Sequence, residues 1–143
     1  MNAPPGYKTG GPMQFLIIDD DVVARTTLKN HLSAMFSGCK ISEAANGAQG
    51  LFQFFKKKPD LIFLDMLMPI MDGRAVLDAL RECYRCGQIV KKPKVVLISM
   101  LDTMQIDQMH PLADSPLVLT VVKKPVTRNL LQQIEAFLPR FMA

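Results

Sequence analysis

Five short apolar runs, separated by helix-like segments, constrain the fold of this chain more than any other feature. The runs lie at residues 15–18, 39–46, 60–65, 94–99 and 117–122, and most are nearly continuous in apolar residues. Such runs are typical of strands that are buried on both faces. Helical segments are expected at 21–36, 47–58, 73–86, 102–110 and 127–138. Strictly alternating strands and helices predict an α/β domain with a parallel sheet and right-handed crossovers.

The apolar spacing within these helices predicts which side chains face the sheet. We expect Leu28, Leu32 and Met35 to face inward from the first helix, Leu51, Phe52 and Phe55 from the second, and Leu130, Leu131, Ile134 and Phe137 or Leu138 from the last. Asp72 and Thr127 stand where N-cap residues belong, and Pro59 should end the second helix.

Polar residues follow four of the predicted strands. They are Asp19–Asp21 after the first, Asp65 after the third, Ser99 after the fourth and Lys123–Lys124 after the fifth. Ligands of open parallel sheets bind beyond the carboxyl ends of the strands. We therefore expect these four groups to converge at one edge of the sheet.

This set of side chains is typical of phosphoryl-transfer chemistry. Adjacent carboxylates repel each other unless a cation lies between them, and oxygen ligands favour Mg²⁺. A lysine and a hydroxyl opposite would neutralise and hydrogen-bond a phosphoryl group. A carboxylate could then act as the nucleophile that accepts it.

Two families use such a constellation, and the stretch FLIIDDDVV resembles both. The first is the haloacid dehalogenase-like phosphatases, whose opening motif D-x-D-x-[TV] is satisfied by Asp19, Asp21 and Val23. Ser99 and Lys124 could pass for its next two motifs. That family also needs an acidic pair beyond the lysine, whereas Glu135 is the only carboxylate after Lys124.

The sequence resembles a second family more specifically, the CheY-like receiver domain of response regulators. The run DLIFLDMLMPIMDG fits D-x-x-x-x-D-x-x-M-P-x-M-D-G without a gap, and EAANGAQGL is similar to E-A-x-N-G-x-x-A-L. VVLIS supplies the hydroxyl position, and VVKKPVT resembles the lysine–proline motif before the last helix. The resemblance extends over about residues 13–138.

The resemblance implies a fold and a role for each matching residue. The fold would be a flavodoxin-like, doubly wound five-stranded parallel sheet of order 2-1-3-4-5, with helices on both faces. Asp65 would be phosphorylated, and Ser99 and Lys124 would contact the phosphoryl group. Mg²⁺ would be bound directly by Asp20, Asp65 and the backbone carbonyl of Leu67, and through water by Asp19. Asp21 would then cap the first helix, and the Lys124–Pro125 bond would be cis.

Three positions depart from the pattern of that family. Val121 replaces the usual aromatic or histidine side chain three residues before Lys124, and Met100 replaces a small residue after the hydroxyl. Leu67 and Leu101 are apolar where polar groups can position a hydrolytic water. We therefore expect slow self-dephosphorylation. A receiver-shaped interaction module that is not phosphorylated stays an alternative.

Length and composition limit the remaining possibilities. A chain of 143 residues suits one domain, here expected at 13–140 after a flexible leader at 1–12, with no output domain. It lacks an apolar segment of membrane-spanning length and a secretory signal, and its three cysteines suggest a reducing cytoplasm.

The net charge of +4 reflects lysine clusters without interleaved aromatic residues, so nucleic-acid binding is not favoured. Cys83 and Cys86 form a C-x-x-C without further nearby metal ligands, and we interpret them as ordinary residues.

The receiver resemblance also implies partners. The donor would be a sensor histidine kinase or a histidine phosphotransfer protein, and the output would be a change in contacts with a downstream protein. Such a domain would not be a turnover enzyme, and a monomer is favoured.

Overall fold

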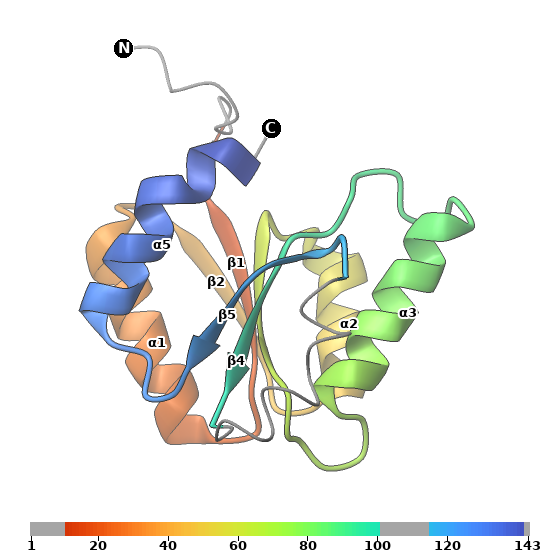
Figure 1. Cartoon of the computed structure of the whole chain (residues 1–143), viewed down its shortest axis with the longest axis horizontal. Helices are drawn as coiled ribbons and strands as arrows, with labels where there is room; N and C mark the ends of the chain where they lie inside the picture. Colours follow the sequence, from red (N-terminus) through yellow and green to blue (C-terminus); the bar gives the residue numbers. More distant parts are fainter. Residues whose placement is uncertain (1–10, 101–114, 142–143) are drawn as a thin grey trace.

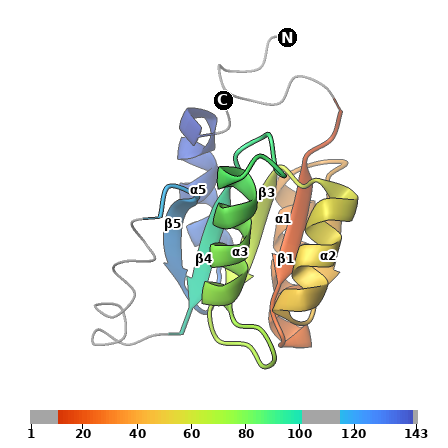
Figure 2. The same cartoon turned by 90° about the vertical axis from the view of Figure 1, so that its right-hand side faces the viewer.

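A five-stranded parallel sheet forms the centre of the computed structural model, which describes residues 11–100 and 115–141. Its strands are β1 (Gln14–Ile18), β2 (Lys40–Ala44), β3 (Leu61–Asp65), β4 (Val95–Ser99) and β5 (Val118–Lys123). They pair in the order β2-β1-β3-β4-β5 (Figures 1 and 2). The predicted flavodoxin-like fold and strand order are confirmed.

Within the described residues, four helices cover the two faces of this sheet. Figure 1 shows α1 (Val22–Met35) and α5 (Arg128–Phe141) on one face, and α2 (Gly47–Lys57) and α3 (Gly73–Arg85) on the other. None of the helices in the described residues is long and apolar enough to cross a membrane. The expected helix at 102–110, Leu101 and most of the expected leader lie outside the described residues, as do the side chains of Phe137 and Leu138.

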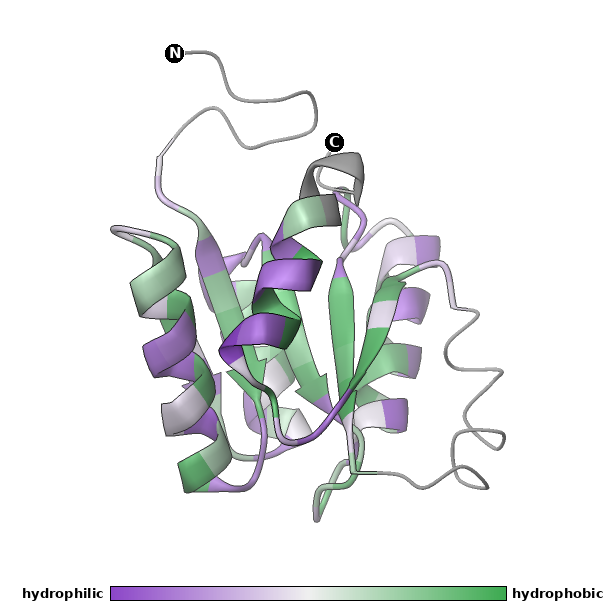
Figure 3. Cartoon of the chain, turned by 60° about the vertical axis from the view of Figure 1, so that its left-hand side comes forward, coloured by the Kyte–Doolittle hydropathy of each residue, from purple (hydrophilic) through white to green (hydrophobic). Residues whose placement is uncertain are grey.

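The alternating directions of strand side chains divide the core into two layers. Phe15 and Ile17 of β1 pack with Leu28 and Leu32 of α1, and with α5. Leu16 and Ile18 point the other way and pack with α2 and α3. In Figure 3 most of the strand residues are hydrophobic, whereas the helices carry hydrophilic residues on their outer sides. The three central strands, β1, β3 and β4, are thus buried on both faces, as their continuous apolar runs predicted, whereas the edge strands β2 and β5 are partly exposed.

Three of the helices, α1, α3 and α5, begin where the sequence predicted N-caps. The side chain of Asp21 accepts a hydrogen bond from the N–H of Val23, and Asp72 accepts one from Ala75. The hydroxyl of Thr127 accepts one from Leu130 at 3.2 Å. These bonds satisfy backbone donors that have no partner inside the helix.

The predicted inner face of α2 was wrong for two of its three residues, whereas Leu51 packs against the core as predicted. Phe52 and Phe55 are 66% and 46% exposed, and Phe54 is the buried aromatic residue of this helix. Gly50 faces the sheet so closely that a Cβ on it would lie 2.5 Å from the side chain of Ile18, and a Cβ on Gly47 would meet Met71 and Val76. Two glycines and Phe54, spaced three and four residues apart, therefore define the inner face.

Candidate functional site

Strand register brings the first acidic run beside Asp65. Ile18 of β1 pairs with Leu64 of β3, so the next residues along the two strands, Asp19 and Asp65, are neighbours at the carboxyl edge. Asp65 in turn pairs with Ile98 of β4, one residue before Ser99. The convergence predicted from topology is therefore present.

Three carboxylates meet at this edge. Oxygen atoms of Asp19, Asp20 and Asp65 lie within 4.8 Å of one another. Asp19 and Asp65 are 3% and 5% exposed, whereas Asp20 is open to solvent. Asp21 is not a member of the cluster, because its side chain caps α1. This is the division that the receiver resemblance implied, with Asp19 and Asp20 in the site and Asp21 as a helix cap.

Lys124 reaches this cluster from the end of β5. Its Nζ lies 2.7 Å from Asp19 Oδ2 and 3.5 Å from Asp65 Oδ2. The peptide bond between Lys124 and Pro125 is cis, as expected from the resemblance. The backbone N–H of Lys124 donates to the carbonyl of Ser99 at 2.7 Å, which fixes the lysine relative to the end of β4. Ser99 itself is buried.

Burial and neighbouring charges shift the pKa values of Asp65 and Lys124. Burial and the negative charge of Asp19 raise the pKa of Asp65 to about 6, although Lys124 and the N–H of Leu67 act in the opposite direction. Burial alone would lower the pKa of Lys124, but the carboxylates of Asp19 and Asp65 outweigh it and raise that pKa. One lysine therefore does not neutralise this cluster.

The loop after Asp65 is held by close backbone contacts at two glycines. The N–H of Gly73 donates to the carbonyl of Met66, and that of Gly47 donates to Met71, both at 3.1 Å. A Cβ on Gly73 would lie 2.5 Å from the carbonyl oxygen of Asp65, and one on Gly47 would lie 2.5 Å from that of Met71. The two sequence motifs thus pack against each other and fix the backbone around Asp65.

Arg25 supports the site and was not predicted from the sequence. Its Nη1 donates to the backbone carbonyl of Asp19 at 2.6 Å, and its Nε lies 3.4 Å from Glu43. Arg25 therefore connects α1, the end of β1 and β2 around the acidic turn. The signal available was a basic residue in the second turn of the helix that follows three carboxylates.

A cavity of about 280 Å³ lies beside the carboxylates. Asp19, Lys124 and Met100 line it, together with residues of α1 and the segment after Lys124. Met100 is 71% exposed, and Val121 on β5 is 36% exposed. An exposed thioether side chain therefore stands beside the site.

The donor set suits a hard divalent cation. All three acidic side chains offer oxygen ligands, and no cysteine or histidine of the described residues belongs to the cluster. Burial, and then the negative charge of Asp19, raise the pKa of Asp65, and a cation would relieve the repulsion between the two carboxylates. Across the two described ranges, no other group of three or more acidic, histidine or cysteine side chains is close enough to hold a metal. The C-x-x-C cysteines lie free at the end of α3.

Comparison with known proteins identifies the family. The sequence model of the response regulator receiver domain matches residues 15–135. The chain belongs to this family. It is a receiver domain of the kind found in two-component systems, and the resemblance to haloacid dehalogenase-like phosphatases does not extend beyond isolated motifs.

Curated relatives of this receiver domain include two response regulators. The nitrate/nitrite response regulator NarL of Escherichia coli K12 is 42% identical over 79 residues, which are 55% of this chain and 37% of NarL. Response regulator MprA of a Mycobacterium species (strain KMS) is 36% identical over 71 residues, or 50% of this chain and 30% of MprA. The matches thus span about a third of the length of these relatives.

Solved structures share the fold over nearly the whole receiver domain. The CheX–CheY–BeF3–Mg²⁺ complex of Borrelia burgdorferi contains a chain that is 25% identical, with a TM-score of 0.71 and 90% of each chain covered. The N-terminal domain of protein WS1339 from Wolinella succinogenes is 26% identical, with a TM-score of 0.70 and coverage of 90% of this chain and 95% of that chain.

Proposed function

We propose that this receiver domain accepts a phosphoryl group on Asp65 and signals through its contacts with other proteins. The observation that carries the proposal is the setting of Asp65, a buried carboxylate with Asp19, Asp20 and Lys124 around it. No other carboxylate of the cluster stands at the end of the central strand within the run that resembles the receiver motif.

In this transfer a P–O bond to Asp65 would replace the P–N bond of the phosphohistidine donor. A carboxylate oxygen of Asp65 attacks the phosphorus of a phosphohistidine, the P–N bond breaks, and the imidazole leaves and takes up a proton. Asp65 must be ionised to attack. Without metal, burial and Asp19 raise its pKa to about 6, and a bound cation would favour the ionised form. Lys124 stands 3.5 Å from Asp65 and would pair with the transferred group.

Mg²⁺ would be held by Asp20, Asp65 and the carbonyl of Leu67, with Asp19 acting through water. When bound, the ion would supply charge neutralisation between carboxylates and phosphoryl oxygens. Asp19 is already 2.7 Å from Lys124, which suits a less direct role at the metal. Ser99 would donate a hydrogen bond to a phosphoryl oxygen from the end of β4.

The partners follow from this chemistry. We infer that the donor is a histidine kinase or a histidine phosphotransfer protein and that a downstream protein reads the phosphorylated state. The chain would not be a turnover enzyme, because its own carboxylate is the substrate. Leu67 is 62% exposed next to Asp65 and has no polar atoms in its side chain to position a water. We therefore propose a long-lived phosphoryl group.

A receiver-shaped module that works without phosphorylation is the competing function. Met100 beside the approach and Val121 in place of a ring are the observations that favour it. Intact-mass measurement after incubation with Mg²⁺ and a small acyl phosphate separates the two. We expect a gain of one phosphoryl group that EDTA and Asp65→Asn abolish. A chain that binds Mg²⁺ but gains no mass, from either the small donor or a phosphorylated kinase, would support the module.

A further inference from the structure

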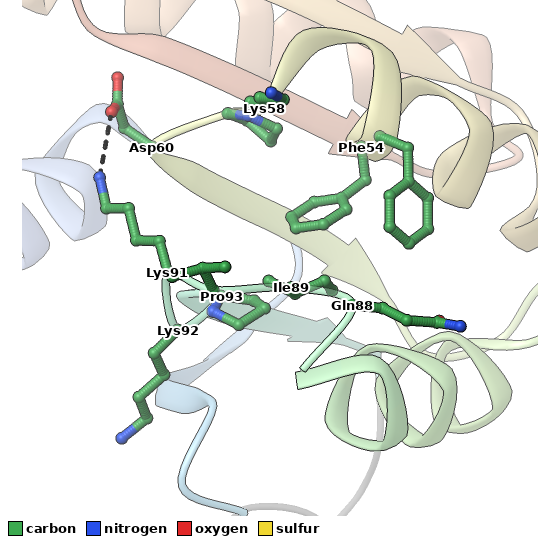
Figure 4. Close-up of a pocket in the computed structure, with 11 residues that line it drawn as sticks. Phe54, Lys58, Asp60, Gln88, Ile89, Lys91, Lys92 and Pro93 are labelled. Carbon is green, nitrogen blue, oxygen red and sulfur yellow. Dashed lines mark ion pairs between the residues drawn. The ribbon is translucent and has the colours of Figure 1, made fainter. Parts of the chain in front are cut away.

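We propose that the opposite edge of the sheet carries a docking pocket for an acidic peptide segment of a partner protein, with one apolar side chain as its anchor. The pocket has a volume of about 350 Å³. It lies between the end of α2, the residue before β3 and the loop that connects α3 to β4 (Figure 4). The proposal is independent of phosphorylation at Asp65.

The pocket is separated from the phosphorylation site by the length of a strand. Asp60 lines it directly before β3, and Asp65 ends that strand five residues later. At about 3.3 Å per residue, the two positions are roughly 16 Å apart. A peptide in this pocket would therefore leave the phosphorylation edge open.

The floor of the pocket is apolar and partly exposed. Phe54 of α2 and Ile89 of the α3–β4 loop both line the pocket, and each is 8% exposed. Phe55 is 46% exposed, and Val90 is 91% exposed although it is a branched apolar residue. This volume is at the lower end of the range of small-molecule sites and suits one large apolar side chain better than an extended ligand.

Lysines surround this floor. Lys58, Lys91 and Lys92 line the pocket and are exposed. Lys91 Nζ lies 3.8 Å from Asp60 Oδ1, whereas Lys92 points away from Asp60 in Figure 4. Within residues 11–100 and 115–141, neither Lys58 nor Lys92 has an ion-pair partner. The pocket therefore presents unpaired positive charge around an apolar centre.

Two further observations concern the lysines around this pocket. Burial and the neighbouring charges of Lys91 and Lys92 lower the pKa of Lys94, which directly precedes β4. Lys58 caps α2 in the left-handed conformation, with φ of 49°, where glycine is the usual residue. The chain thus places a lysine where its backbone geometry favours glycine.

Charge complementarity argues for an acidic peptide. Carboxylates flanking an apolar anchor would meet the lysines while the anchor covers Phe54 and Ile89. Single-stranded nucleic acid would need successive stacking platforms, and Phe55 is the only exposed aromatic residue that lines the pocket. Nucleic acid is therefore the alternative that the experiment must separate.

The test titrates the full chain, without Mg²⁺ or phosphate donor, with a blocked hexapeptide of five glutamate or aspartate residues and one phenylalanine. Backbone amide shifts in two-dimensional NMR should change at 54–58, 60 and 88–92 and not at Asp65. Replacing the phenylalanine of the peptide by alanine should weaken binding at least about fivefold, since the anchor contact is lost. Oligothymidylate of similar length should bind more weakly.

Variants of the chain separate a specific pocket from diffuse charge. Lys58→Gly with Lys92→Gln should weaken peptide binding about fivefold, and the glycine relieves backbone strain at its position. Lys57→Gln removes a charge from the same helix outside the pocket and should change binding less than twofold. Val90→Asp, at an exposed position, should also weaken binding. Equal effects of Lys57→Gln and the pocket variant, tighter oligothymidylate binding, or no amide shifts at about 1 mM peptide would each overturn the proposal.

Discussion

Replacing Asp65 by asparagine should stabilise the protein at neutral pH and remove the phosphorylated group at the same time. The pKa of Asp65 is raised from its ordinary value of 3.8 to about 6, chiefly by burial and by Asp19. Ionised Asp65 therefore opposes folding above about pH 6, and this penalty disappears as the pH falls and the folded protein takes up a proton. The difference corresponds to at most about 3 kcal/mol. Because the edge is open to water at Asp20, we expect about 1–3 kcal/mol.

Urea denaturation in EDTA, followed by circular dichroism between pH 4 and 8, measures this effect. Asp65→Asn should be more stable than the wild type at pH 8, and the two free energies of unfolding should approach each other as the pH falls from about 6 to 4. Asp78→Asn is a matched control, since this exposed carboxylate lies 3.3 Å from Arg81 and should matter by less than about 0.5 kcal/mol. An asparagine variant that is less stable at pH 8, or a difference that does not depend on pH, would refute the reasoning.

Three other substitutions test the site. Lys124→Met removes the cation that contacts Asp19 and Asp65, and phosphorylation from a small donor should slow by at least about tenfold in stopped-flow measurements; an unchanged rate would contradict the role of Lys124. Leu67→Asn introduces a polar group beside the phosphoryl position and should shorten its half-life severalfold, as followed by mass spectrometry; a wild-type half-life of seconds would already contradict slow hydrolysis. Gly73→Ala should cost about 2 kcal/mol or more in urea, because its Cβ would meet the carbonyl of Asp65, whereas Gly38→Ala has open space and should cost about 1 kcal/mol.

The position of the site could be predicted because it follows from the parallel arrangement of the strands. Parallel strands align their carboxyl ends, so polar residues that follow Ile18, Leu64, Ile98 and Val122 must meet at one edge. The N-caps were also predictable, since a short polar side chain directly before a helix can accept a hydrogen bond from a free backbone N–H of the first turn. Strand order depended on the resemblance, because several orders fit an alternating pattern.

Packing details that depend on distance between elements could not be predicted. In α2 the run of apolar residues left its inner face ambiguous, and the glycines, rather than the largest side chains, decided which face met the sheet. The bond from Arg25 to the carbonyl of Asp19 depends on how far α1 lies from β1. The pocket at the opposite edge joins segments 30 or so residues apart that carry no motif.

Locating the phosphoryl group is the most direct test of the central claim. The protein is incubated with Mg²⁺ and a small acyl phosphate, reduced with borohydride, digested and sequenced by tandem mass spectrometry. Reduction converts a phosphorylated aspartate to homoserine and so marks the residue. We predict homoserine at position 65 in the wild type and none in Asp65→Asn. Homoserine at Asp19 or Asp20, or none anywhere in a protein that binds Mg²⁺, would contradict the account.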